Sequence, residues 1–149
     1  MVCFCKNLIT LFVIIKVLVL FDDFLVHKLN QISRNEYLCF MIVICQRLLK
    51  NTKISGITLF PFIILRKPEY RHDPILINHE KIHLRQQLEL LIIFFYLWYV
   101  MEYYYRLFKL KNRDLAYRSI SFEREAYAME ANPDYLENRN HWSFWKYIK

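Results

Sequence analysis

Glycine is almost absent from this chain: Gly56 is the only one among 149 residues, and four prolines accompany it. Tight hairpin turns and phosphate-binding loops depend on glycine, because its backbone adopts positive φ angles without steric cost. A chain with one glycine therefore has no Gly-rich nucleotide-binding motif and little material for hairpins. The composition favours a mainly helical fold.

Cysteine is also sparse, and the four cysteines all lie in the first third of the chain: Cys3, Cys5, Cys39 and Cys45. No CxxC pair is present, so neither a zinc ribbon nor a dithiol redox motif is indicated. This spacing is typical of small apolar fillers in a reduced or lipid environment. A metal or redox site at Cys3-x-Cys5 is the weaker alternative.

Acidic residues are outnumbered, with 14 Asp and Glu against 21 Lys and Arg, and 56% of the chain is hydrophobic. A nucleic-acid-binding protein would be expected to combine basic charge with stacking aromatics on a polar surface, and no recognised motif of that kind occurs. A basic and strongly apolar chain instead indicates an anionic membrane surface. We therefore expect membrane lipid as a partner and no nucleic acid.

One motif carries chemistry: His79-Glu80-Lys81-Ile82-His83, an HExxH pattern. On a helix, residues four apart share a face, so the two imidazoles can hold one metal ion. The glutamate projects about 100° away, where it can reach a water on the metal without being a ligand. This is the zinc-peptidase arrangement of two nitrogen ligands, a general base, and room for one more protein ligand and a water.

The helix that carries this motif has a well-marked start, because Asp73 is a good N-cap and Pro74 a good first residue. No glycine or proline follows before Leu110, and an unbroken helix of that length would measure about 55 Å. The segment must therefore bend, or its far half enters lipid. Leu90–Met101 is continuously apolar, and with the following tyrosines and a snorkelling Arg106 it could span or enter a membrane. The alternative is a buried core helix.

A second helix-prone stretch, Ser121–Glu130, contains three carboxylates. Here the chain resembles the gluzincin metallopeptidases, in which the third zinc ligand is a glutamate on a later helix, often within the pattern E-x-x-A-D. The pentapeptide E-R-E-A-Y that begins at Glu123 matches at Glu and Ala, but Tyr127 stands where Asp is usual. The resemblance implies Zn²⁺ as the cofactor and Glu123 as the third ligand beside His79 and His83.

The departure at Tyr127 leaves open which group orients a ligating histidine, since an Asp would normally accept its second N–H. The tyrosine hydroxyl could do so more weakly or could donate to a developing oxyanion, and a backbone carbonyl could orient the ring equally well. Tyr117 and His72 are further candidates for an oxyanion donor. His141 is an alternative third ligand.

The stretch from Ser55 to Lys149, about two thirds of the chain, looks like a compact group of poorly characterised bacterial HExxH proteins. This likeness divides the chain into a zincin-like metallohydrolase core at residues 51–149 and an apolar extension at residues 1–50. The apolar run Leu8–Phe21 could be a membrane span or an uncleaved signal anchor. Alternatively, the extension lies outside the functional protein. The resulting expectation is a membrane-associated protein of the bacterial inner membrane.

Upstream of the HExxH helix, the segment Ile57–Leu65 is rich in β-branched and aromatic residues. Pro61 restricts it to a sheet edge, because proline cannot donate to a ladder. An edge strand there could pair with an extended peptide substrate, and the alternative is a simple extended or membrane-dipping segment. We expect a mainly α fold: a zincin-like core with the HExxH helix, the Glu-bearing helix and at most this short edge strand.

These observations predict a zinc-dependent metallopeptidase-like hydrolase of peptide or protein substrates. Zinc would be held by His79, His83 and Glu123, and Glu80 would take the proton of the attacking water. One alternative is a non-enzymatic small membrane protein with an incidental or structural metal site. A di-iron carboxylate bundle is a third reading of Glu80-x-x-His83, and it lacks the second ExxH pair that such bundles need.

Overall fold

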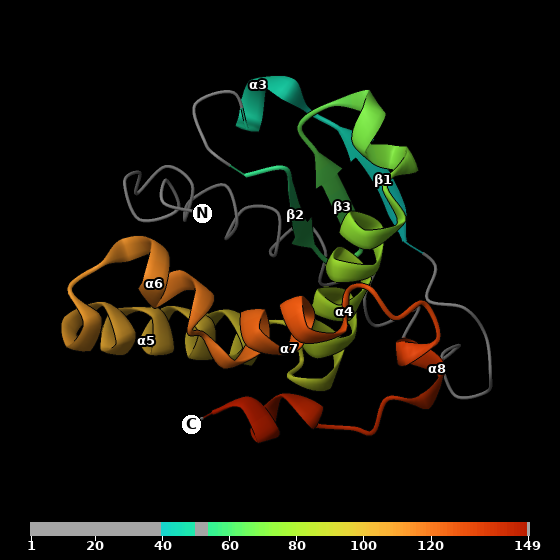
Figure 1. Cartoon of the computed structure of the whole chain (residues 1–149). Helices are drawn as coiled ribbons and strands as arrows, with labels where there is room; N and C mark the ends of the chain where they lie inside the picture. The colour runs from blue at the N-terminus through green and yellow to red at the C-terminus, as the bar shows by residue number, and fades with distance from the viewer. Residues whose placement is uncertain (1–39, 50–53, 149) are drawn as a thin grey trace. The chain divides into compact units, whose positions relative to one another are not determined.

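The computed structural model describes residues 40–49 and 54–148, which belong to one unit that begins at Phe40 (Figure 1). Helices dominate this part of the chain, so the expected mainly helical fold is confirmed. The elements in chain order are β1 Met41–Ile44, α3 Gln46–Leu49, β2 Gly56–Leu59, β3 Phe62–Leu65, η1 Pro68–His72, α4 Pro74–Glu89, α5 Ile93–Leu110, α6 Arg113–Arg118, α7 Ser121–Met129, α8 Tyr135–Asn138 and η2 Ser143–Tyr147. The expectations for Leu8–Phe21 and for Cys3, Cys5 and Cys39 lie outside the described residues.

The strands form a sheet of order β1-β3-β2, with β1 parallel and β2 antiparallel to β3. The prediction of at most one short edge strand at Ile57–Leu65 underestimated this sheet, because that stretch forms two paired strands. Pro61 lies in the turn between them, where no ladder donor is needed, and its carbonyl accepts from the N–H of Met41. The alternating burial of β2 and β3 turns one face of the hairpin toward the core.

Helix α4 begins as expected, with the Asp73 carboxylate accepting from the N–H groups of Ile75 and Leu76 at 3.1 and 3.2 Å. It ends before a sharp bend in which Leu91 and Ile92 have φ angles of 49° and 58°. This bend buries Leu90 and Ile92 in the core and starts α5 in a new direction. The long helical pattern of the sequence is therefore two helices.

No helix in the part of the chain that the structure describes is long and apolar enough to cross a membrane. This finding overturns the predicted transmembrane helix, and with it the predicted membrane association and inner-membrane localisation. The physical reason lies in α5, which carries Glu102, Arg106 and Lys109 among its 18 residues. The Glu102 carboxylate is buried and accepts from the backbone N–H and hydroxyl of Ser121 at 3.1 and 2.6 Å.

That contact fixes the start of α7, which packs against α4 (Figure 1). Aromatic side chains fill the space behind both helices: the ring centroids of Phe95 and Phe122 lie 4.6 Å apart, and those of Phe122 and Phe144 lie 4.7 Å apart. These three rings are almost fully buried. The aromatic core thus packs α5, α7 and η2 against one another.

Candidate metal centre

The three predicted ligands come together at the α4–α7 contact. The Nε2 atoms of His79 and His83 lie 3.1 Å apart. The Glu123 carboxylate places Oε2 3.6 Å from the Nε2 of His79 and Oε1 3.5 Å from the Nε2 of His83. All three side chains are buried. They form a group close enough to hold one metal ion.

These separations suit a tetrahedral ion. With metal–ligand bonds of about 2.1 Å, the ligand atoms of a tetrahedral zinc site lie about 3.4 Å from one another. The three separations observed among His79, His83 and Glu123 bracket that length. An ion at the centre therefore requires only small adjustments of the side chains.

Both imidazoles are oriented by partners at their Nδ1 atoms. The Nδ1 of His79 lies 2.8 Å from Oε2 of Glu130, and the Nδ1 of His83 lies 2.8 Å from Oε1 of Gln86. A carboxylate only accepts, and the Gln86 amide nitrogen is occupied in donating to the carbonyl of Phe122 and to Glu125. Each Nδ1 is therefore the protonated nitrogen, which leaves the Nε2 atoms of the neutral rings as acceptors.

The arrangement of acceptor atoms in this site requires a positive charge among them. Two acceptor nitrogens that face each other at 3.1 Å repel each other, and Oε2 of Glu123 is buried without a hydrogen-bond partner. Buried polar groups of this kind are costly unless something compensates them. Either a proton on one ring or a metal ion supplies the missing positive charge, so the residues present fit a metal ion.

In the metal-free protein the proton resides on His83. Burial disfavours the charged ring, but the negative charge and hydrogen bond of Glu123 outweigh burial and raise the pKa of His83 to about 9. The same interaction, against the opposing effect of burial, holds the pKa of Glu123 below its usual range. A metal ion that binds this site must displace the proton.

Zinc binding at pH 7 should therefore release close to one proton from His83. The pKa of about 9 makes the affinity rise about tenfold per pH unit from pH 7 and level off above pH 9, where the ring is already neutral. Calorimetric titration in buffers of different ionisation enthalpy measures the released proton. An observed heat of binding that is the same in every buffer at pH 7 would contradict the prediction.

Glu80 lies beside this group rather than within it. Its Oε2 accepts from the Thr58 hydroxyl at 2.5 Å, and the same hydroxyl lies 3.1 Å from the backbone oxygen of Glu80. Burial raises the pKa of Glu80, while the charges of His83 and His79 and the Thr58 hydrogen bond act against burial. A Cβ at Gly56 would stand 2.8 Å from Oε1 of Glu80, so the chain's one glycine leaves room for this carboxylate against β2.

Tyrosines surround the glutamate ligand. The Tyr99 hydroxyl donates to Oε1 of Glu123 at 2.6 Å. Burial and the charge of Glu123 raise the pKa of Tyr117, which therefore stays protonated beside the carboxylate. The Tyr127 ring contacts the His79 ring edge-on, with 4.8 Å between centroids, and is 41% exposed. The question that the sequence left open is answered for His79: Glu130, not Tyr127, accepts from its Nδ1.

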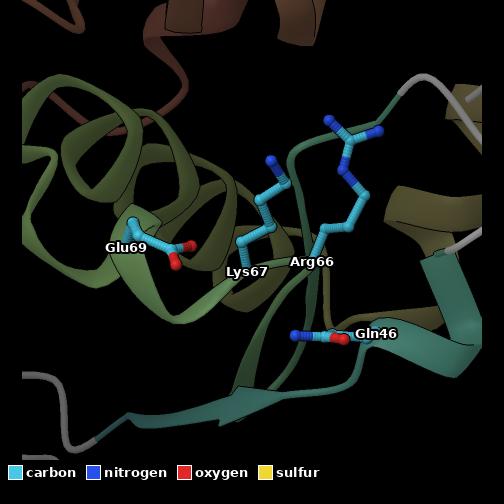
Figure 2. A pocket seen from close by; sticks show the side chains of 4 residues that line it. All are labelled: Gln46, Arg66, Lys67 and Glu69. Carbon is cyan, nitrogen blue, oxygen red and sulfur yellow. The ribbon is translucent and has the colours of Figure 1, made fainter.

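The other predicted histidines lie outside the group. His72 is exposed at the end of η1. His141 is exposed and its Nδ1 lies 3.5 Å from Glu89, so it pairs with that carboxylate rather than replacing Glu123. A pocket of about 530 Å³ is lined by Gln46, Arg66, Lys67 and Glu69 (Figure 2), and none of the predicted site residues lines it.

Several groups that shape the site were missed by sequence reasoning: Gly56, Thr58, Gln86, Tyr99 and Glu130. Two of them had a signal in the helical period. Gln86 lies one turn after His83, and Glu130 lies two turns after Glu123, so each shares a face with a predicted ligand. Gly56 and Thr58 had no such signal in the sequence, because only the tertiary fold brings β2 against α4.

No protein-family model, curated protein or solved structure matches the chain. The assignment of a function to the site therefore depends on the geometry of the site.

Proposed function

We propose that this protein is a zinc-dependent hydrolase of peptide bonds. The observation that carries the proposal is the convergence of His79, His83 and Glu123 on one point, with Glu80 beside them and outside the ligand set. Three protein ligands leave a coordination position open, which is the mark of a catalytic rather than a structural zinc site. A zincin-like core with a gluzincin type of ligand set is the corresponding finer reading of the fold.

The donor set supports zinc over other common ions. Two imidazole nitrogens and one carboxylate are the ligands of the thermolysin type of zinc site, whereas calcium and magnesium prefer oxygen ligands alone. Among residues 40–49 and 54–148, no fourth His, Cys, Asp or Glu joins the group. A closed structural site would require one.

Bound there, Zn²⁺ would act as a Lewis acid that polarises the scissile carbonyl and lowers the pKa of water to about 7. Glu80 accepts the proton of the attacking water and returns it to the leaving amine. Its raised pKa suits this exchange, because an ordinary carboxylate is too weak a base near neutral pH. Glu130 and Gln86 hold the two imidazoles in the ligating tautomer.

Removal and return of the metal test the proposal. The purified full chain should contain about one zinc, should cleave an unfolded protein substrate such as casein, and should lose both zinc and cleavage after dialysis against a chelator. Adding back one equivalent of zinc should restore cleavage, because the ligands are held by the fold. A protein that regains zinc and thermal stability but cleaves no member of a peptide library would instead contain a structural zinc site.

A further inference from the structure

A line of buried polar side chains runs away from the metal centre behind His83. Gln86 is fully buried and joins His83 to Glu125: its Oε1 faces the imidazole, and its Nε2 donates to Oε2 of Glu125 at 3.0 Å. Glu125 is also fully buried and accepts from the Tyr135 hydroxyl at 2.8 Å. The line ends at Arg139, the residue farthest along it from His83. The Nε of Arg139 donates to Oε1 of Glu125 at 2.5 Å, and its Nη2 lies 3.3 Å from Oε2.

Burying such charges does not stabilise a fold better than apolar packing would, because both ions lose their hydration. Arg139 is nevertheless buried and also contacts Glu89, so one guanidinium binds a carboxylate from α4 and one from α7. This arrangement instead determines which groups donate hydrogen bonds and which accept them. An arginine can only donate, so both carboxylates must accept from it.

The donor or acceptor role of each group then determines the role of the next group in the line. Because Glu125 and the Phe122 carbonyl only accept, Gln86 must turn its amide nitrogen toward them and its oxygen toward His83. Because an oxygen faces His83, the Nδ1 of that ring always carries a hydrogen, and the Nε2 beside Glu123 is the nitrogen that can lose its proton and bind a metal ion. The hydrogen-bonding polarity of a metal ligand is thus set by a residue that does not touch the metal site.

We propose that Arg139, Glu125 and Gln86 form a positioning relay that fixes the ring orientation and tautomer of His83 and thereby raises the metal affinity of the site. The relay rests on the proposed metal site and deepens it. Glu130 does the equivalent work for His79 directly, from a carboxylate that is partly exposed.

The chain offers a matched control for Gln86 in its neighbour Gln87. Both are glutamines of α4 with at most 1% of the surface exposed. Gln87 holds β2 instead, through Thr58 and Phe60: its Nε2 donates to the carbonyl of Thr58 at 3.0 Å, and its Oε1 accepts from the N–H of Phe60 at 2.9 Å. Replacing either with Met removes a buried amide of the same size, but only one of the two amides contacts a metal ligand.

Zinc dissociation constants, measured by competition with a chromophoric chelator, test the relay. Gln86→Met should weaken binding about 10- to 100-fold, the range for outer partners of metal ligands, and Gln87→Met should leave it within about threefold. Arg139→Lys, which cannot bind both carboxylates with one planar fork, should weaken binding less than Gln86→Met does. Equal losses for Gln86→Met and Gln87→Met would overturn the relay.

A pair of polar variants gives the same comparison if the Met variants do not fold. Gln86→Glu alone sets two carboxylates against each other, whereas Gln86→Glu with Glu125→Gln restores an amide donor between them and keeps an acceptor toward His83. The double variant should regain most of the zinc affinity that the single variant loses, and failure to do so would overturn the relay. None of these measurements uses hydrolysis, so a zinc-binding protein that cleaves nothing overturns the proposed function alone.

Discussion

His79→Ala, His83→Ala and Glu123→Ala should each abolish stoichiometric zinc binding. Each variant removes one of the three protein donors found among the described residues, and the remaining pair cannot enclose the ion. The loss of affinity should therefore exceed the roughly 100-fold upper range seen when an outer partner of a metal ligand is replaced. Metal analysis of the purified variants, followed by chelator competition at pH 7, measures the effect.

The exposed histidines provide the controls. His72→Ala and His141→Ala remove imidazoles that lie outside the group, so both variants should keep about one zinc at the affinity of the unmodified chain. Glu123→Gln is a sharper test, because it keeps the size of the side chain and its contact with Tyr99 but removes the charge. If Glu123→Ala bound zinc as tightly as the unmodified chain, the carboxylate would not be a ligand and the assignment of α7 to the site would fail.

How much of this site can be read from the sequence depends on the range of each contact. His79 and His83 lie four residues apart on one helix, so local geometry alone predicts that they can share a metal. Glu123 lies 40 positions after His83, and only a resemblance to known metallopeptidases singled it out. The packing of α7 on α4 then determines whether its carboxylate reaches the imidazoles. No local pattern contains that information.

The fold was predictable to the same extent. The low glycine content and the Asp73-Pro74 start indicated helices correctly, whereas the β2–β3 hairpin was read as one strand because its turn contains no glycine. The apolar run Leu90–Met101 predicted a membrane segment, with a buried core helix as the alternative. In the fold it includes the bend and the first part of α5, whose Phe95 and Tyr99 point into the aromatic core. Hydropathy measures how apolar a segment is and does not show which of its side chains the fold buries: in this run Phe94, Leu97 and Met101 are exposed.

Glu80→Gln should separate metal binding from catalysis. Because Glu80 stands outside the ligand set, the variant should hold zinc as tightly as the unmodified chain. An amide cannot take up the proton of the attacking water, so hydrolysis should fall by about 10² to 10⁴-fold, the usual contribution of a general base. Both quantities can be measured on one preparation. Full activity of the variant on an identified substrate would show that the base is another group.

Thr58→Val tests whether Glu80 acts as a general base or has only a structural role. Burial raises the pKa of Glu80, and the Thr58 hydrogen bond opposes that rise. Removing the hydroxyl should raise the pKa further, so the carboxylate will be protonated, and the rate lost, at a higher pH than in the unmodified chain. The acid limb of the pH dependence of kcat/KM should consequently move upward in Thr58→Val and disappear in Glu80→Gln. A merely structural Glu80 would lower the rate in both variants and leave the position of that limb unchanged.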